Sequence, residues 1–128
     1  MRYFNILILI LMSHVSSSLL PTSLKQSRIK FLAQSGNIIG TSGVLELNGY
    51  KFTNIIDLTK DIPDAIIIAM FYNPSCPHCQ KLEPMFELTA KDADVNNPNI
   101  IFVKVNVVEY SFLVEKYRIS FLPDVRVN

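Results

Sequence analysis

The chain of 128 residues has no tryptophan, only two cysteines and no marked excess of either charge. A formal net charge of +1 provides no basic surface of the kind that nucleic acids or anionic membranes bind. Two cysteines are also too few for the disulfide framework that holds many small secreted folds together. The length and the hydrophobic share of 49% are instead typical of one globular domain with an additional apolar segment.

The additional apolar segment lies at the N-terminus. The run Ile6–Met12 follows a positively charged start and precedes small residues, with Val15 and Ser17 suited to the −3 and −1 positions of a cleavage site. This run is much shorter than the roughly 20 apolar residues that a membrane-spanning helix needs. The pattern predicts a secretory signal peptide over residues 1–17 and no membrane span. The alternative is a buried N-terminal strand or helix.

The rest of the chain alternates between strand-like and helix-like hydrophobic patterns. Residues 18–42 form a lead-in that is expected to contain a short helix. Alternation of strands with helices indicates an open α/β sheet with helical crossovers, and the last expected strand lies at the end of the chain. An apolar sheet edge is therefore expected to lie open. The strands are predicted at 44–47, 65–72, 100–106 and near 125, and the helices at 50–56, 76–93 and 112–117.

The two cysteines, Cys76 and Cys79, are separated by two residues and lie between an apolar strand pattern and a helical one. A thiol at the start of a helix faces unpaired backbone N–H groups and the positive end of the helix dipole, which favour the thiolate. Pro77 suits the first turn of a helix, and His78 can add positive charge. Because Cys79 lies one turn further on, it is placed to close a disulfide with Cys76. We interpret the pair as a dithiol redox centre.

Two other uses of the cysteine pair remain open. A structural disulfide here would close a very small loop and constrain little of the unfolded chain. A zinc ion needs four ligands, and in the mature chain only His78 would join the two cysteines as a candidate. No metal ion or other cofactor is therefore expected.

The stretch from Phe71 to Pro84 resembles the active-site region of the thioredoxin-like family, and most of all the catalytic domains of protein disulfide isomerases. It shares the cysteine spacing, the histidine between the cysteines and a helix-bending proline five residues after the second cysteine. The resemblance implies a thioredoxin-like α/β fold over residues 43–128, with a central mixed sheet flanked by helices. It also implies that the C-terminal strand and helix of the family are missing, so that the domain is incomplete.

The resemblance also implies roles for the residues of the cysteine motif. Cys76 and Cys79 are the catalytic pair, and Pro77 and His78 tune their reduction potential. The Pro-His pair is similar to that of the bacterial periplasmic disulfide oxidase, which favours an oxidising dithiol. The alternative for His78 is a solvated surface side chain.

A second segment, up to Pro123, is similar to the approach to the cis-proline of the family. A cis bond there would place the backbone of Leu122 against the disulfide, so substrate peptide is expected to bind at Leu122, Pro123 and Ser75. Ser75 replaces the usual tryptophan, and Met70 replaces a buried acid that moves protons during exchange. The isomerase resemblance implies that Lys104 is half-buried under the sheet. Because Met70 carries no charge to pair with it, we expect Lys104 instead to extend from its strand into solvent.

These features predict a thiol–disulfide oxidoreductase or isomerase of the endoplasmic reticulum lumen, acting on cysteine-containing proteins or peptides. One alternative is the redox-active lumenal domain of an oligosaccharyltransferase subunit, with that complex as its partner. That domain also begins with a signal peptide and tends to have an apolar residue where Met70 stands. Another alternative is a thioredoxin-like module that binds peptides but whose catalysis is weakened.

Overall fold

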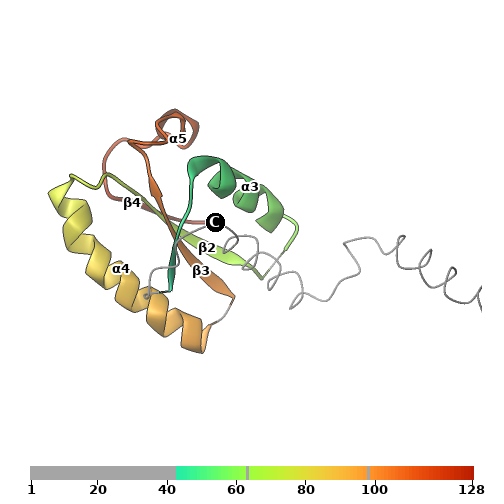
Figure 1. The fold of residues 1–128 in the computed structure, drawn as a ribbon. Coiled ribbons are helices and arrows are strands. Elements are labelled where there is room, and N and C mark those ends of the chain that lie inside the picture. The colour runs from blue at the N-terminus through green and yellow to red at the C-terminus, as the bar shows by residue number, and fades with distance from the viewer. Residues whose placement is uncertain (1–42, 63, 98) are drawn as a thin grey trace, which may run out of the picture.

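The computed structural model describes residues 43–62, 64–97 and 99–128. Strands and helices alternate along these residues as the sequence predicts (Figure 1). The predicted signal peptide, the lead-in helix and their residues 1–42 lie outside the described residues. The strands are β1 (Val44–Glu46), β2 (Ile66–Tyr72), β3 (Ile100–Asn106) and β4 (Asp124–Val127). The helices are α3 (Gly49–Thr59), α4 (Pro77–Asn96) and α5 (Phe112–Lys116).

The four strands form one mixed sheet in the order β1-β3-β2-β4. Strand β3 is parallel to both β1 and β2, whereas β4 runs antiparallel to β2. The carboxyl ends of the three parallel strands therefore meet at one edge of the sheet, together with the first residue of β4. We call this edge the carboxyl edge, and it is marked by Glu46, Tyr72, Asn106 and Asp124.

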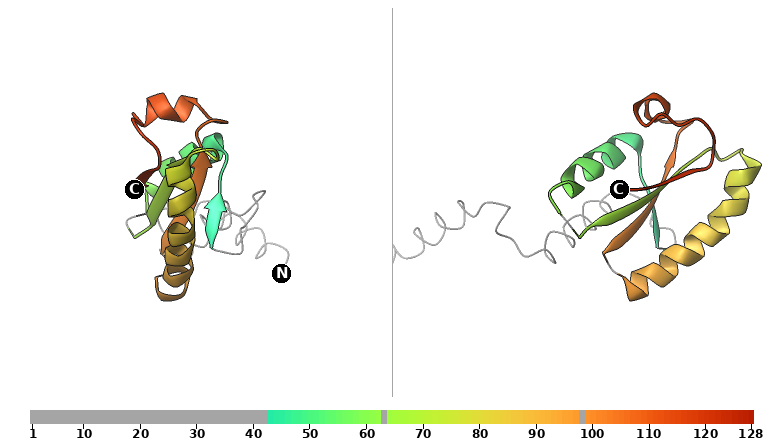
Figure 2. Two further views of the ribbon diagram at one scale, coloured as in Figure 1. Left: turned by 90° about the vertical axis from the view of Figure 1, so that its left-hand side faces the viewer. Right: turned by 180° about the vertical axis from the view of Figure 1, so that it is seen from behind.

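The sheet lies between α4 on one face and α3 with α5 on the other (Figure 2). Successive side chains of a strand point to opposite faces, so β2 contributes to both layers of the core. Ile67 and Phe71 pack on the α3 side, whereas Met70 and Tyr72 pack under α4. Both faces of β2 are covered, which explains why its sequence is an almost continuous apolar run.

Three aromatic rings hold α3 and the end of α5 against the sheet. The rings of Phe52 and Phe71 meet edge to face with centroids 5.2 Å apart, and Tyr117 lies within 5.5 Å of both. Phe52 and Phe71 are fully buried, and Phe86 is buried on the α4 side. The sequence predicts Phe31, Phe52, Phe71 and Phe86 as core residues. The structure confirms this for the last three, and Phe31 lies outside the described residues.

The turn between β1 and α3 is fixed by its own residues. The backbone N–H of Lys51 donates to the side chain of Asn48 at 2.8 Å and caps the first turn of α3. At Gly49 a Cβ atom would lie 2.7 Å from the Cβ of Tyr110. Only glycine leaves room there, so the start of α3 can pack directly against the segment that follows β3.

The element bounds differ from the predicted ones by one residue at several ends and by three residues at the ends of two helices. Helix α3 ends at Thr59 rather than at 56, and α4 ends at Asn96 rather than at 93. At the end of α4 the N–H of Asn97 still donates to the carbonyl of Ala93 at 2.7 Å, so the backbone ladder continues through exposed polar residues that carry no hydrophobic signal. The continuous apolar run of β2 predicts a strand that is buried on both faces, but its first residue, Ile66, is 39% exposed because it lies at the end of the sheet.

Strand β4 forms one edge of the sheet, where Val125 and Val127 remain 45% and 69% exposed. An open apolar edge was expected from the sequence, and β4 provides one. Within the described ranges, no helix has both the length and the apolar character that crossing a bilayer requires.

We expect Phe71→Ala to lower the free energy of unfolding by about 3–5 kcal/mol, because it removes a fully buried ring that contacts two others. Urea unfolding followed by circular dichroism measures this change. The matched control is Leu88→Ala on the outer side of α4, where the side chain is 64% exposed and the change should stay within about 0.5 kcal/mol. Equal losses in the two variants would contradict the placement of the core.

Candidate active site

Cys76 lies where the loop after β2 turns into α4. It is the N-cap residue of the helix, and Pro77 occupies the first helical position. The N–H of Ser75 donates to the side chain of Asn73 at 2.8 Å, and the N–H of Cys76 donates to the Asn73 carbonyl at 3.0 Å. The Gln80 side chain donates back to the carbonyl of Pro74 at 2.9 Å. These bonds hold the loop so that the Cys76 sulfur stands over the first turn of α4.

The pKa of the Cys76 thiol lies below its ordinary value. The largest cause is the backbone N–H of Cys79, followed by the Cys79 side chain; burial opposes them, and the backbone N–H of His78 adds a smaller lowering. The Cys76 side chain makes no capping hydrogen bond to the first turn of α4, and the N–H groups there favour the thiolate by facing its negative charge. The direction of this shift is the one that the sequence predicts for a thiol at a helix start.

The Cys79 thiol is in a different environment. It is only 2% exposed and packs in the apolar layer under α4 with Met70, Tyr72 and Phe86. Burial raises the pKa of Cys79, and the neighbouring Cys76 side chain raises it further. Both cysteines are unbridged. The site therefore combines one accessible, acidic thiol with one protected thiol of higher pKa.

The predicted peptide-binding residues lie next to the accessible thiol. The bond between Leu122 and Pro123 is cis, and the carbonyl oxygen of Leu122 lies 3.8 Å from the Cys76 sulfur. Leu122 and Pro123 are half-buried, whereas Ser75, which directly precedes Cys76, is exposed. The structure thus brings Cys76, Leu122 and Pro123 together from segments that are more than forty residues apart in the sequence.

The two residues between the cysteines, Pro77 and His78, are exposed. Pro77 belongs to the first turn of α4, and the backbone N–H of His78 faces the Cys76 sulfur. Neither placement measures a reduction potential, so tuning by these residues stays a prediction. Among the described residues, no three side chains of His, Cys, Asp or Glu are grouped so that they could hold a metal ion.

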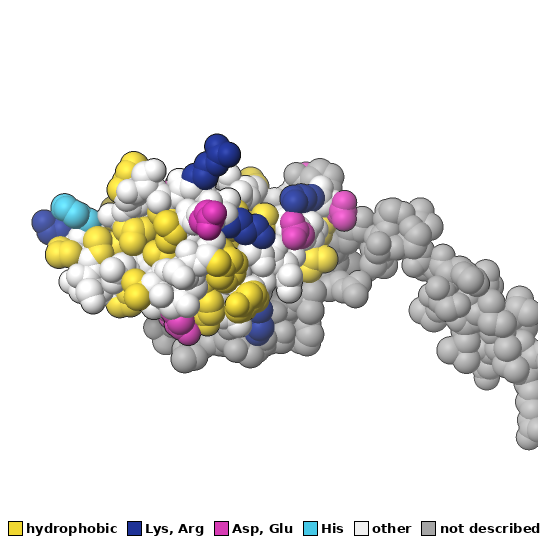
Figure 3. Space-filling view, turned by 90° about the horizontal axis from the view of Figure 1, so that it is seen from above, with side chains coloured by type: hydrophobic (Ala, Val, Ile, Leu, Met, Phe, Trp, Pro, Cys, Tyr) yellow, Lys and Arg dark blue, Asp and Glu magenta, His cyan; other side chains and the backbone are white. Residues whose placement is uncertain are grey.

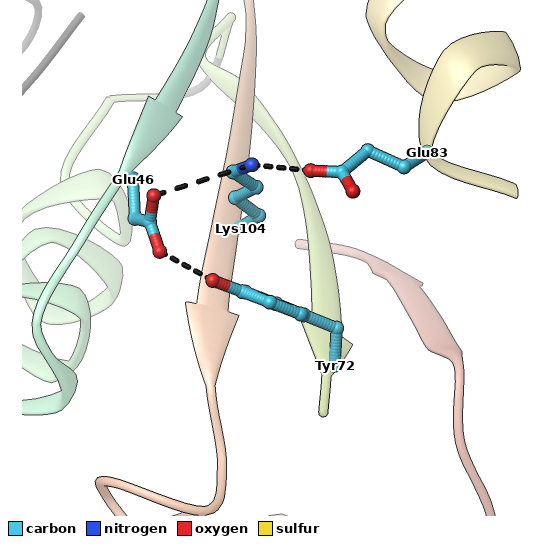
Figure 4. A network of polar contacts seen from close by, with 4 residues as sticks. All are labelled: Glu46, Tyr72, Glu83 and Lys104. Carbon is cyan, nitrogen blue, oxygen red and sulfur yellow. Dashed lines mark hydrogen bonds and ion pairs between the residues drawn. The ribbon is translucent and has the colours of Figure 1, made fainter. Parts of the chain in front are cut away.

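The prediction that Lys104 extends into solvent is wrong. Its side chain is 17% exposed and lies between α4 and the sheet, where it pairs with Glu83 of α4 and approaches Glu46 of β1 to 4.0 Å (Figure 4). Its ammonium group also lies 5.5 Å from the centre of the Tyr72 ring. The hydroxyl of Tyr72 donates to Glu46, which completes a network of four side chains from four elements.

This network explains how the sheet accommodates Lys104 although its neighbour in the register, Met70, is uncharged and fully buried. Glu83 and Glu46 provide the negative charge from α4 and β1. Burial, with Glu46 as hydrogen-bond acceptor, raises the pKa of Tyr72, so its hydroxyl stays protonated and donates. The sequence did contain a signal for this ion pair. Glu83 follows Cys79 by one helical turn, which places it on the side of the helix that faces the sheet.

The family profile of thioredoxin matches residues 43–128 of the chain. The chain belongs to the thioredoxin family. Protein disulfide-isomerase A4 of Mus musculus is 35% identical over 78 residues, which cover 56% of this chain and 12% of that protein. The ER-retained PMA1-suppressing protein 1 of Saccharomyces cerevisiae is 29% identical over 76 residues, or 58% of this chain and 11% of that protein. The chain thus spans about an eighth of the length of these relatives.

Solved structures agree with this assignment. The first thioredoxin domain of mouse protein disulfide-isomerase A4 aligns with a TM-score of 0.59 and 26% identity, covering 73% of this chain and 64% of that domain. The first two thioredoxin domains of Saccharomyces cerevisiae Eps1p align with a TM-score of 0.52 and 28% identity, covering 64% of this chain and 30% of that structure. The predicted thioredoxin-like α/β fold and the relation to the disulfide isomerases are confirmed.

We expect Cys76 to react with iodoacetamide at lower pH than Cys79, because its lowered pKa supplies thiolate where the raised pKa of Cys79 does not. The alkylation rate of each cysteine, followed by mass spectrometry against pH, should have its midpoint below about 8.5 for Cys76 and above it for Cys79. In urea-unfolded protein both midpoints should return to the value of a free thiol. Equal midpoints in the folded protein would contradict the two environments.

Lys104→Met should lower the free energy of unfolding by about 1–3 kcal/mol, because Glu83 and Glu46 then face each other without a cation. Urea unfolding provides the measurement. The control, Lys60→Met, removes the partner of Asp57 in an exposed pair whose side chains are 69% and 65% exposed. Because solvent screens this exposed pair, the loss should be much smaller than that of Lys104→Met, and an equally large loss would argue against the network.

Proposed function

We propose that the chain is a thiol–disulfide oxidoreductase or isomerase that acts on protein cysteines through Cys76 and Cys79. The observation that carries the proposal is the contrast between the two thiols, one accessible with a lowered pKa and one buried with a raised pKa, on the same turn of α4. A stabilised thiolate at Cys76 makes the reduced dithiol favourable, which corresponds to an oxidising centre. The relation to the disulfide isomerases supports this reaction class.

Oxidation of a substrate dithiol begins from the disulfide between Cys76 and Cys79. A substrate thiolate attacks the Cys76 sulfur, a mixed disulfide forms, and the Cys79 sulfur leaves as a thiolate that takes up a proton. The second substrate thiolate then attacks the substrate sulfur of the mixed disulfide. The Cys76 thiolate leaves, and two electrons have passed from the substrate to the protein. In the reverse of the first step, the Cys79 thiolate attacks the Cys76 sulfur of the mixed disulfide. This attack releases a substrate whose second thiolate has not reacted.

The Leu122 carbonyl beside Cys76 supports binding of a substrate backbone at this point. An extended peptide could donate an N–H to this oxygen while its cysteine sulfur reaches the Cys76 sulfur. Ser75 and Pro123 would then contact the substrate on either side. Met70 supplies no carboxylate at the position where the family has a proton-moving acid, so we expect release of the substrate by Cys79 to depend on water or His78 as proton acceptor.

We further propose that the protein works in the lumen of the endoplasmic reticulum. The apolar N-terminal run supports entry into the secretory pathway, and a yeast relative is named as retained in that compartment. A disulfide can persist there, whereas cytosolic thiols are kept reduced. Association with an oligosaccharyltransferase complex stays a prediction from the sequence.

Cys76→Ser should abolish oxidative refolding of a reduced, unfolded substrate such as ribonuclease, because no sulfur remains for the first attack. Cys79→Ser should instead accumulate mixed disulfides with the substrate, which are visible as larger bands on non-reducing gels. Leu88→Ala, on the exposed outer side of α4 and nine residues after Cys79, is the matched control and should keep the activity. If both cysteine variants refold the substrate at the rate of the unaltered chain, the proposed function is wrong.

A further inference from the structure

Three aromatic side chains form a cluster on the surface, which we call the aromatic patch (Tyr50, Tyr110 and Phe112). Tyr50 stacks on Phe112 with ring centroids 5.0 Å apart and an angle of 24° between the planes. Tyr110 meets Tyr50 edge to face at 6.2 Å. Tyr50 is 66% exposed and Phe112 is 37% exposed, so the rings hold one another in place while much of their area faces solvent.

The aromatic patch lies on the same edge of the sheet as the thiols. Tyr50 is in the first turn of α3, which follows β1, whereas Tyr110 and Phe112 follow β3. Cys76 follows β2, and these three strands are parallel (Figure 1). The aromatic patch and the loop that ends in Cys76, which we call the thiol loop, therefore both lie at the carboxyl edge.

Backbone bonds fix the segments of this edge to one another. The N–H of Leu47 donates to the carbonyl of Lys104 at 3.0 Å, and the N–H of Val107 donates to the carbonyl of Tyr72 at 3.0 Å. Neighbouring strands lie about 4.8 Å apart, and β3 separates β2 from β1, so the carboxyl ends of β1 and β2 lie about 10 Å apart. An extended chain covers about 10 Å in three residues, and the loops beyond the strand ends add to the separation between the patch and Cys76.

Other exposed apolar side chains lie along the same edge. Val108, in the turn after β3, is 62% exposed, and Phe121, just before the Leu122 carbonyl, is 75% exposed. Viewed from above, onto this edge, hydrophobic side chains gather in patches among a few charged groups (Figure 3). Single exposed apolar residues are common on proteins, but contiguous apolar surface next to a reactive group is typical of a binding site.

We propose that the aromatic patch binds an apolar or aromatic side chain of an unfolded polypeptide whose cysteine, four or more residues away, is engaged by Cys76. The proposal rests on the proposed function and adds to it the class of substrate sequence. The aromatic patch, the thiol loop and the Leu122 carbonyl all lie at the carboxyl edge, which favours an extended substrate segment as the occupant. Tyrosine and phenylalanine suit this role because they offer large, stiff contact areas.

The test compares two ten-residue peptides that carry one cysteine as a mixed disulfide with thionitrobenzoate. One peptide has phenylalanine at the positions four residues before and after the cysteine, and the other has serine there. The reduced Cys76 thiolate attacks the peptide sulfur, the bond to thionitrobenzoate breaks, and the released anion is measured by absorbance. The unaltered chain should react faster with the phenylalanine peptide.

Tyr50→Glu is the informative variant, because an acidic side chain suits the first turn of a helix and preserves α3 while removing the ring. It should lower the second-order rate constant for the phenylalanine peptide about three- to tenfold and leave the serine peptide unchanged. Leu88→Ala is the matched control, since Leu88 is 64% exposed but lies on the outer side of α4. Equal rates for the two peptides, equal losses with both, or the same loss in Leu88→Ala would overturn the proposal.

A small disulfide substrate, oxidised glutathione, distinguishes failure of this proposal from failure of the proposed function, because it has no apolar or aromatic side chain to bind at the patch. If the unaltered chain fails to react with oxidised glutathione or with either peptide, the oxidoreductase function is wrong. A separate experiment then tests whether the patch binds peptide. A cysteine-free phenylalanine peptide is added to the Cys76→Ser variant, and its binding is monitored by the shifts of backbone amide signals in nuclear magnetic resonance. Shifts at Tyr50, Tyr110 and Phe112 that vanish in Tyr50→Glu would support it, and their absence would overturn it.

Discussion

The first turn of α4 directs its unpaired N–H groups at the Cys76 sulfur, and the other features of the site depend on this contact. It requires the loop after β2 to end in the N-cap position, which the Asn73 and Gln80 hydrogen bonds hold in place. It also requires β2 to be fixed, which packing on both of its faces provides. The lowered pKa of Cys76 is thus a property of the fold as a whole rather than of the cysteine motif alone.

The same helix places the two thiols in different electrostatic environments. Because Cys76 ends the loop and Cys79 lies three residues later on the side of α4 that faces the sheet, one sulfur meets solvent and N–H dipoles, whereas the other meets apolar side chains. Further along the same side of the helix, Glu83 reaches Lys104. A single helix face therefore contributes a redox group, an apolar layer and one half of an ion pair.

The carboxyl edge joins these features into a surface that a substrate can cross. Three parallel strands release their loops there, and the antiparallel β4 returns Leu122 and Pro123 to the same place. The aromatic patch after β1 and β3, the thiolate after β2 and the backbone acceptor before β4 then follow one another along the edge. This order follows from the strand order β1-β3-β2-β4, because neighbouring positions in the sheet are not neighbours in the sequence.

The sequence by itself determined the element order, the core phenylalanines Phe52, Phe71 and Phe86, and the thiol at a helix start, because hydrophobic period and local capping are properties of short segments. The sequence did not predict where α3 and α4 end, because the exposed polar residues of their last turns continue the helix without any hydrophobic periodicity. Only the tertiary structure decided where Lys104 points, because its partners come from α4 and β1. The aromatic patch was likewise decided by the packing of α3 against the turn after β3, which no local pattern contains.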